Sequence, residues 1–196
     1  MPQQRTNPMT NLVYTAYPEA DLREIADTLN QRRADKGEVV RRFGLPEDQS
    51  RRYLKVPQLW RVLQAVFTGA DTPDNAQLIA AIDGIEYLDG WSDMGAAYIL
   101  PDDTAAIAAA LAKVDFAARL AAFNADLAQN AEELSAEADL AAFAEAFHIR
   151  GSEEFDHSDS PERAEELGAW FARLCGFYRA AAADGCGVIV SFVEHV

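Results

Sequence analysis

The stretch "SPERAEELGAWFARLCGFYRAAAADGCGVIVSFVEHV", residues 160–196, holds a complete predicted helix and a complete predicted strand. Ser160 suits the N-cap, and Pro161 suits the first helical position because proline has no N–H to leave unpaired. Gly185 is a typical stop signal after a helix that runs to Asp184. Residues 187–196 are apolar and β-branched, which indicates a central strand. The sequence therefore predicts a long helix that leads into a buried strand.

Two earlier segments are also predicted to be strands. Residues 11–17 ("NLVYTAY") alternate apolar and polar side chains and include β-branched and aromatic residues. Residues 96–100 ("AAYIL") are apolar enough for a buried strand, and a short extended piece at residues 85–90 ("IEYLDG") precedes them. Strands are thus expected near the N-terminus, in the middle and at the C-terminus.

Amphipathic patterns predict helices between these strands. One predicted helix carries a stripe with the spacing i, i+3, i+4, i+7, formed by Leu22, Ile25, Ala26 and Leu29. Residues 56–69 predict a second helix, with Pro57 in its first turn, an apolar face (Leu59, Trp60, Leu63 and Phe67) and Gly69 at its end. Residues 72–84 repeat this arrangement, with Thr72 as N-cap, Pro73 at the first position and Gly84 after the last turn.

The other segments differ sharply in helical propensity. Residues 103–147 are rich in alanine and favour helix, with breaks expected near Asp115 and over residues 124–130. Asp102 or Asp103 is the expected N-cap there. Residues 34–52 are charged and contain glycine and proline, so we expect short turns or a mobile excursion.

These elements predict an α+β fold. We expect a small, mostly antiparallel sheet of N-terminal, middle and C-terminal strands, packed with several helices, and a C-terminal two-thirds that is rich in helix. No internal repeat or clear linker divides the chain. We expect one domain over residues 9–196, preceded by a disordered extension over residues 1–8.

The net charge of −15 is distributed unevenly. Residues 1–63 carry 11 Lys/Arg and 8 Asp/Glu, whereas residues 64–196 carry 6 and 24. Such a balance argues against nucleic acid and anionic membranes as partners, because both are polyanions. It suits attraction of a basic protein, although acidic helix faces also serve simply to keep an alanine-rich protein soluble.

The two cysteines do not form a disulfide framework. Cys175 is about ten residues before the helix end, hence roughly 15 Å from it at 1.5 Å per residue, too far to bridge Cys186. Two free thiols are expected. The polar N-terminal residues and the lack of a run of about 20 apolar residues favour a cytoplasmic protein without a membrane span.

Catalytic signatures are absent from the sequence. It contains no G-x-S-x-G, P-loop, G-x-G-x-x-G, H-E-x-x-H or C-x-x-C motif. His148 and His195 are interpreted as a helix-end residue and a terminal residue. Oxygen-bearing side chains crowd residues 153–159, but without the pattern of a calcium loop, so a solvated acidic loop is favoured. We expect a non-catalytic protein with no metal site and no cofactor.

Candidate binding residues centre on "GWSDMG", residues 90–95. Trp91 lies in a turn-rich segment and is the aromatic side chain expected to be most exposed, with Asp93 as a polar neighbour. Tyr98 and Trp60 are further candidates, although aromatic residues at strand or helix spacing are more often part of a core. The basic run over residues 32–55 is interpreted mainly as pairing with the acidic part of the same chain.

Three segments in order resemble a known family: "YLKVPQLWRVLQAVFTG", "GWSDMGAAYILPDDTAAIAAAL" and "LCGFYRAAAADGCGVIVSFV". They are similar to the bacterial YfbM-like family, domain of unknown function 1877, which implies an α+β fold and supplies no reaction. In that family the middle segment typically reads Gly-Pro-Ala-Arg, an aromatic residue and Leu. Gly95, Ala97 and Leu100 match this pattern, whereas Ala96 and Tyr98 stand at the Pro and Arg positions.

Two hypotheses for function follow. The first is a non-catalytic interaction module that binds a basic partner, as small acidic immunity-type proteins do. The second is a small-molecule binder or an enzyme with a cleft near residues 90–98. A salt-sensitive complex with a basic partner favours the first, and a ligand response that depends on Trp91 favours the second.

Overall fold

One antiparallel sheet forms the centre of the protein. The computed structural model describes residues 10–31, 35–44, 52–57, 59–68, 74–125 and 160–194. The strands are β1 (Thr10–Pro18), β2 (Tyr53–Val56), β3 (Glu86–Tyr87), β4 (Ala96–Ile99) and β5 (Cys186–Glu194). Their order across the five-stranded sheet is β2-β1-β5-β4-β3, and every neighbouring pair is antiparallel. The predicted α+β class and antiparallel sheet are confirmed.

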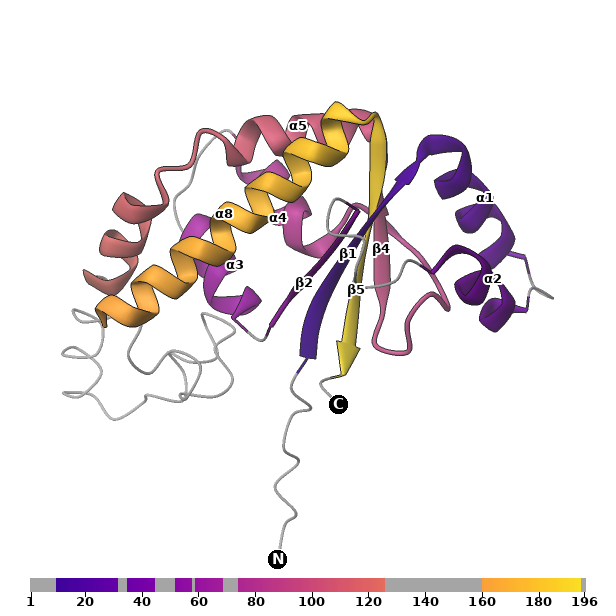
Figure 1. The fold of residues 1–196 in the computed structure, drawn as a ribbon, viewed down its shortest axis with the longest axis horizontal. Helices are drawn as coiled ribbons and strands as arrows, with labels where there is room; N and C mark the ends of the chain where they lie inside the picture. The colour runs from indigo at the N-terminus through magenta and orange to yellow at the C-terminus, as the bar shows by residue number, and fades with distance from the viewer. Residues whose placement is uncertain are drawn as a thin grey trace, which may run out of the picture.

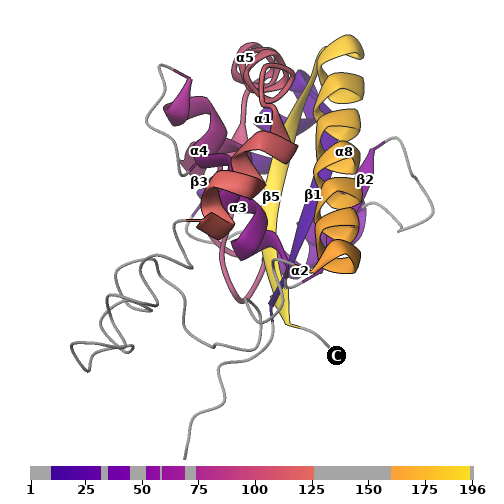
Figure 2. The ribbon, with the colours of Figure 1, turned by 90° about the vertical axis from the view of Figure 1, so that its left-hand side faces the viewer.

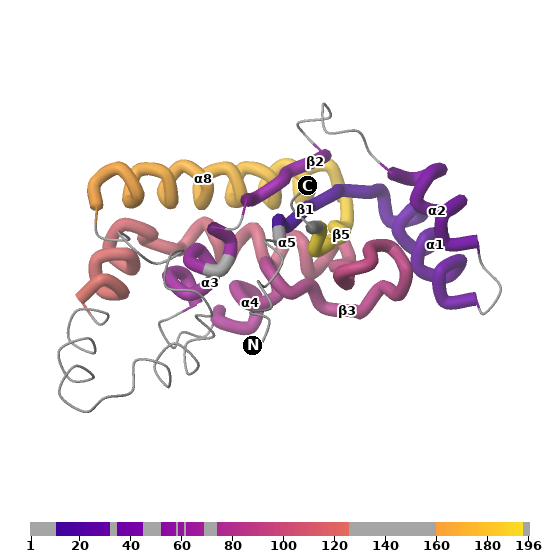
Figure 3. The backbone as a smooth tube through the Cα atoms, turned by 90° about the horizontal axis from the view of Figure 1, so that it is seen from below, coloured from indigo at the N-terminus to yellow at the C-terminus, as the bar shows by residue number. Residues whose placement is uncertain are grey.

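Helices pack on both sides of this sheet (Figure 1). They are α1 (Glu19–Leu29), α2 (Lys36–Phe43), α3 (Trp60–Thr68), α4 (Asn75–Asp83), α5 (Pro101–Leu111), a helix over residues 116–125, and α8 (Pro161–Ala183). Helices α3, α4, α5 and α8 lie on one side of the sheet, while α1 and α2 lie on the other side (Figures 1 and 3). Viewed from the side, α8 runs along the sheet next to β1 and β2 (Figure 2).

Strand β5 is central, as its apolar, β-branched sequence predicts. It pairs with β1 over nine residues, from Thr10↔Glu194 to Pro18↔Cys186, and with β4 on its other edge. Val188 and Val190 face one helical layer and Ile189 faces the other. Since both faces are covered over residues 186–191, every residue of that part of the strand is buried, which is why it lacks polar alternation.

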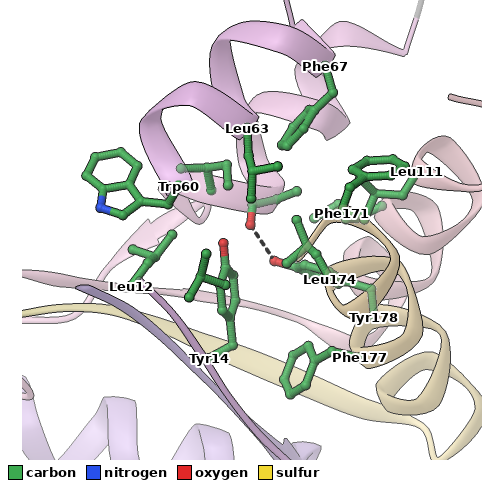
Figure 4. Packing of buried hydrophobic residues seen from close by; sticks show 14 of the residues in the cluster. Leu12, Tyr14, Trp60, Leu63, Phe67, Leu111, Phe171, Leu174, Phe177 and Tyr178 are labelled. Carbon is green, nitrogen blue, oxygen red and sulfur yellow. Dashed lines mark hydrogen bonds between the residues drawn. The ribbon is translucent and has the colours of Figure 1, made fainter. Parts of the chain in front are cut away.

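The larger core lies between the sheet and α3, α4, α5 and α8. Leu12 and Tyr14 of β1 meet Leu63 of α3 and Phe171 and Tyr178 of α8 there (Figure 4). The Tyr178 hydroxyl donates a hydrogen bond of 2.8 Å to the Ala81 carbonyl, which ties α8 to α4. This core explains the long apolar face of α8.

The smaller core lies on the opposite face of the sheet, beneath α1 and α2. The stripe predicted for the first helix, Leu22, Ile25, Ala26 and Leu29, is buried there as expected. Tyr17 of β1 and Ile189 of β5 supply the sheet side, and α2 contributes Val39 as its buried residue. Helix α2 is therefore held against the rest of the protein by a small apolar contact area.

Several predicted helix ends are confirmed. The Ser160 hydroxyl accepts a hydrogen bond of 3.1 Å from the Arg163 N–H at the start of α8. The break near Asp115 is also present, and its carboxylate caps the helix over residues 116–125 by accepting from the Ala118 N–H at 3.1 Å. Gly84 follows α4 as predicted.

Two predicted caps are wrong. The N-cap of α5 is Leu100, and Asp102 and Asp103 lie within the first turn, where they still face the positive end of the helix dipole. Pro101 makes this possible because it starts the helix directly after the strand. The N-cap of α4 is Asp74, whereas the predicted Thr72 and Pro73 lie outside the described residues.

The charged segment over residues 34–52 is not made only of turns. It contains α2, whose N-cap Asp35 accepts a hydrogen bond of 3.1 Å from the Glu38 N–H. Strand β2 follows directly and pairs with β1 from Leu12↔Val56 to Thr15↔Tyr53. Both elements escaped prediction because α2 buries a single apolar residue and β2 has four residues, too few for a clear period.

Both cysteines are free thiols, as predicted. Burial raises the pKa of the Cys175 thiol to about 11. None of the helices that the structure describes combines the length and apolar character needed to cross a bilayer. The predictions for residues 1–8, for the acidic loop at residues 153–159 and for His148 and His195 fall outside the described residues.

Candidate functional site

An open cleft of about 1080 Å³ lies on the sheet face that also carries the smaller core. Its floor is formed by Val13 and Thr15 of β1 and by Ser191 and Val193 of β5. These positions alternate with those that face the larger core, because successive side chains of a strand point to opposite faces. Helix α2 forms one wall of the cleft and the loop between β3 and β4 forms the other.

The loop between β3 and β4, residues 88–95, is tied to the sheet at several points. The Leu88 N–H donates to the Ala96 carbonyl at 2.9 Å, and the Phe192 N–H donates to the Gly95 carbonyl at 3.0 Å. The Ser92 hydroxyl donates to the Phe192 carbonyl of β5, 100 residues away in the sequence. The cleft wall is therefore a fixed part of the fold.

Trp91 is half-buried, which corrects the expectation that it is the most exposed aromatic residue. Its ring meets Tyr17 edge to face, with 6.0 Å between centroids and 85° between planes, and it packs against the smaller core. The anchoring of Ser92 on β5 brings the neighbouring Trp91 down onto the sheet. The sequence could not predict this contact. Tyr17 belongs to β1 and the loop of Trp91 is anchored on β5, so the two rings meet only because β1 pairs with β5 in the tertiary structure.

The structure places the other three predicted binding residues in different environments. Asp93 is exposed and lines the cleft with Trp91. Trp60 is buried in the larger core, edge to face with Phe192 at 5.4 Å. Tyr98 packs on the smaller core and donates a 3.2 Å hydrogen bond to Glu86, and neither Trp60 nor Tyr98 lines the cleft.

Charged groups of both signs face the cleft. Lys36 of α2 forms an ion pair with Asp89 of the loop, as expected for pairing between the basic run and the acidic part. Arg42 instead pairs at 2.8 Å with Glu24, within the N-terminal part. Arg41 and Asp93, on opposite walls, are exposed and have no ion-pair partner among the residues that the structure describes.

Two apolar residues of the cleft rim were not predicted. Large apolar side chains that are exposed in the described ranges are Ile79, Ile85, Tyr87 and Met94. Tyr87, at 70% exposure, and Met94, at 38%, both line the cleft. Tyr87 lies in the two-residue edge strand β3, where a side chain has few neighbours to bury it. The sequence offered one signal that Tyr87 would be exposed, namely that this aromatic residue lies in a very short predicted strand.

The arrangement offers charge pairing, hydroxyl hydrogen bonds and apolar contact. Its lining holds no histidine and no cysteine. Within the described segments, no group of three or more His, Cys, Asp or Glu side chains is placed to hold a metal ion. These side chains are suited to binding.

Comparison with known proteins identifies a family. The model of DUF1877, a domain of unknown function, matches residues 14–191. A solved structure, the protein of unknown function YfbM from Escherichia coli, is similar with a TM-score of 0.53 and 14% sequence identity, over 93% of this chain and 99% of that one. At this identity the likeness concerns the fold alone. Among curated proteins no match is found.

Proposed function

This chain belongs to the DUF1877 family, a domain of unknown function, and we propose that it is a non-catalytic interaction module that binds a basic partner. The partner engages the cleft between α2 and the β3–β4 loop through an exposed, positively charged segment. The proposal takes the sequence-based hypothesis of a basic partner and assigns it to a surface.

One observation carries this proposal: exposed apolar side chains coincide with the cleft. Tyr87 and Met94 stand on its rim, next to the half-buried Trp91. Exposed apolar residues that gather at a concave surface are typical of binding sites, and aromatic residues often contribute most of the affinity. The rim thus supplies the apolar part of an interface.

The overall charge of the protein supports a preference for a basic segment, because the cleft lining itself carries two basic and two acidic side chains. Asp93 presents a carboxylate that has no ion-pair partner within the described ranges. The net charge of −15 attracts cationic partners from a distance and speeds their association. A partner that brings a lysine or an arginine next to an apolar side chain matches this rim.

Size and shape favour a segment of a protein chain. Pockets for small molecules typically enclose about 300–1,000 Å³ and bury most of the ligand. The cleft, at about 1080 Å³, lies at the upper end of that range, but it is open to solvent along its rim and would not enclose a ligand. A peptide segment can cross such a cleft and leave at both ends.

A second candidate is a small molecule that carries charges of both signs. Arg41 on α2 faces the cleft from the wall opposite Asp93, and neither has an ion-pair partner in the described part of the chain. A zwitterionic molecule would satisfy both groups. A ligand at about 100 times its Kd would stabilise the protein by about 2.7 kcal/mol in a thermal-shift screen.

Fluorescence anisotropy with labelled synthetic heptapeptide pools tests the main proposal. The pools carry net charges of about +3, 0 and −3, and each peptide holds one aromatic residue. We expect the basic pool to bind best at low ionic strength and to weaken at high salt. Tyr87→Ala should weaken that binding about 5-fold or more, and Asp93→Asn should also weaken it.

Matched control variants lie outside the cleft. Ile79→Ala removes an apolar side chain of α4 that is 41% exposed, and Asp103→Asn removes an exposed carboxylate of α5. Both should leave peptide binding unchanged. Binding that prefers the neutral pool, or that responds equally to the control and cleft variants, would contradict the proposal.

A bacterial, cytoplasmic location belongs to the same proposal. Its support is that both cysteines are free thiols, as is usual for cytosolic proteins. Fractionation of the native host with an antibody against this chain would test it.

A further inference from the structure

The side chain of Lys36 lies inside the cleft and crosses from one wall to the other. It starts on α2, and its ammonium group pairs with the Asp89 carboxylate on the loop. Its stem passes directly over Gly90, since a Cβ built at position 90 would overlap Cδ, Cε and Nζ of Lys36. Lys36 thus occupies a channel for an alkyl stem, which runs over the Gly90 backbone and ends at the Asp89 carboxylate.

Gly90 makes this channel possible in two ways. Its φ of +77° lies in the left-handed region that favours glycine, which sets the turn of the loop beside Asp89. Its missing side chain leaves room for methylene groups against the backbone. The channel therefore fits a long, unbranched aliphatic chain with a cationic head.

We propose that Lys36 is an internal competitor for a lysine side chain of the partner. The partner's lysine displaces Lys36, lays its stem over Gly90 and pairs its ammonium with Asp89. This inference rests on the proposed binding of a basic partner at the cleft, and it names the group that enters one part of it. Lys36 acts as an autoinhibitory contact.

The Lys36–Asp89 pair is of a kind that can be displaced. The side chains remain 42% and 59% exposed, and exposed pairs hold their partners weakly because water competes for both charges. Helix α2, which carries Lys36, buries Val39 and is otherwise largely exposed. Moving the Lys36 side chain out of the channel therefore disturbs no core residue.

The test compares two variants that each remove one positive charge from the same wall. Lys36→Ala empties the channel, whereas Arg41→Ala removes a charge that also lines the cleft but forms no ion pair with Asp89. The probe is a fluorescein-labelled pentalysine peptide, with its ε-acetylated form as a control. Removing a competitor raises the apparent affinity by the reciprocal of the fraction of sites that it had left free.

We expect Lys36→Ala to raise the affinity for pentalysine about 3-fold more than Arg41→Ala does. Asp89→Asn should weaken binding, and Lys36→Ala should bring no further gain in that background. Lys36→Met, which keeps most of the stem without the ammonium, should give a smaller gain than Lys36→Ala. This variant also serves if the alanine variant fails to fold. The acetylated peptide should respond to none of these changes.

The outcomes separate the two proposals. Equal gains from Lys36→Ala and Arg41→Ala would show general electrostatics and overturn the competitor role, while binding to the cleft would stand. A gain from Lys36→Ala that persists in the Asp89→Asn background would also overturn it. No binding of pentalysine by the wild type or by any variant would overturn the binding of a basic partner and this inference together.

Discussion

Two tyrosines of β1 show how strongly a residue's role depends on the face to which it points. Tyr14 enters the larger core, where its hydroxyl is buried without a hydrogen-bond partner among the described residues (Figure 4). Tyr17 faces the smaller core, and its hydroxyl donates a 2.8 Å hydrogen bond to the Phe43 carbonyl at the end of α2. Burial raises the pKa of both, to about 12 for Tyr17. Both therefore stay neutral at physiological pH.

Removing the hydroxyl should affect stability differently at the two positions. Tyr17→Phe loses a hydrogen bond and leaves the Phe43 carbonyl without its donor, so the free energy of unfolding should fall by about 1 kcal/mol. Tyr14→Phe removes a buried polar atom that has no partner in the described structure, so stability should stay the same or rise. Urea unfolding measures both, and an equal loss in the two variants would contradict this account.

At the scale of the element, α8 combines a well-defined buried face with two weak positions. Apart from the adjacent pair Phe177 and Tyr178, its buried residues recur every three or four positions, and they are Leu167, Phe171, Leu174, Phe177, Tyr178 and Ala181. Gly168 and Gly176 lie within the helix, and an added Cβ would meet no atom within 4 Å at either position. The two glycines therefore lose more backbone entropy on folding than other residues would, although no neighbouring atom requires a residue without a side chain there.

Alanine at either glycine should stabilise the protein. Gly168→Ala and Gly176→Ala should each raise the free energy of unfolding by about 0.5–1 kcal/mol, because alanine loses less backbone entropy in a helix. Gly187→Ala in β5 is the contrasting control. A Cβ there would overlap Leu22 Cδ2 and the Ile99 carbonyl, so this variant should be clearly destabilised in the same denaturation assay. Destabilisation by the two helix variants would refute the prediction.

At the scale of the whole molecule, the excess of negative charge opposes compaction. The net charge is −15, whereas the ion pairs found between described residues lie at the surface. Surface pairs contribute little to stability, while self-repulsion acts across the entire molecule. Added salt should therefore weaken the repulsion among the carboxylates more than it weakens the attraction within the surface ion pairs.

The midpoint of thermal unfolding should rise with salt. Between about 20 mM and 300 mM NaCl at neutral pH, the Debye length shrinks from roughly 20 Å to below 10 Å, which screens repulsion between distant carboxylates. Circular dichroism during heating measures the midpoint, and KCl at equal ionic strength should give the same shift. A midpoint that falls with added salt would mean that the surface pairs outweigh the repulsion.

The sequence predicted much of the fold and less of the candidate site. The stripe of α1, the capped helix α8 and the central strand β5 were all readable, because burial of one face leaves a period in a long segment. Helix α2 and strand β2 were missed, because each is short and buries few side chains. One wall of the cleft is α2, so the cleft residues Lys36 and Arg41 were missed with it.

The sequence by itself determined the class of fold, the helix and strand that end the described chain, and the acidic charge. These properties depend on neighbours in the chain, through spacing, propensity and composition. Tertiary structure alone decided the cleft and the burial of Trp91. Both depend on the pairing of β1 with β5 and on the Ser92–Phe192 hydrogen bond. Such contacts join residues far apart in the chain, and no local pattern of side chains encodes them.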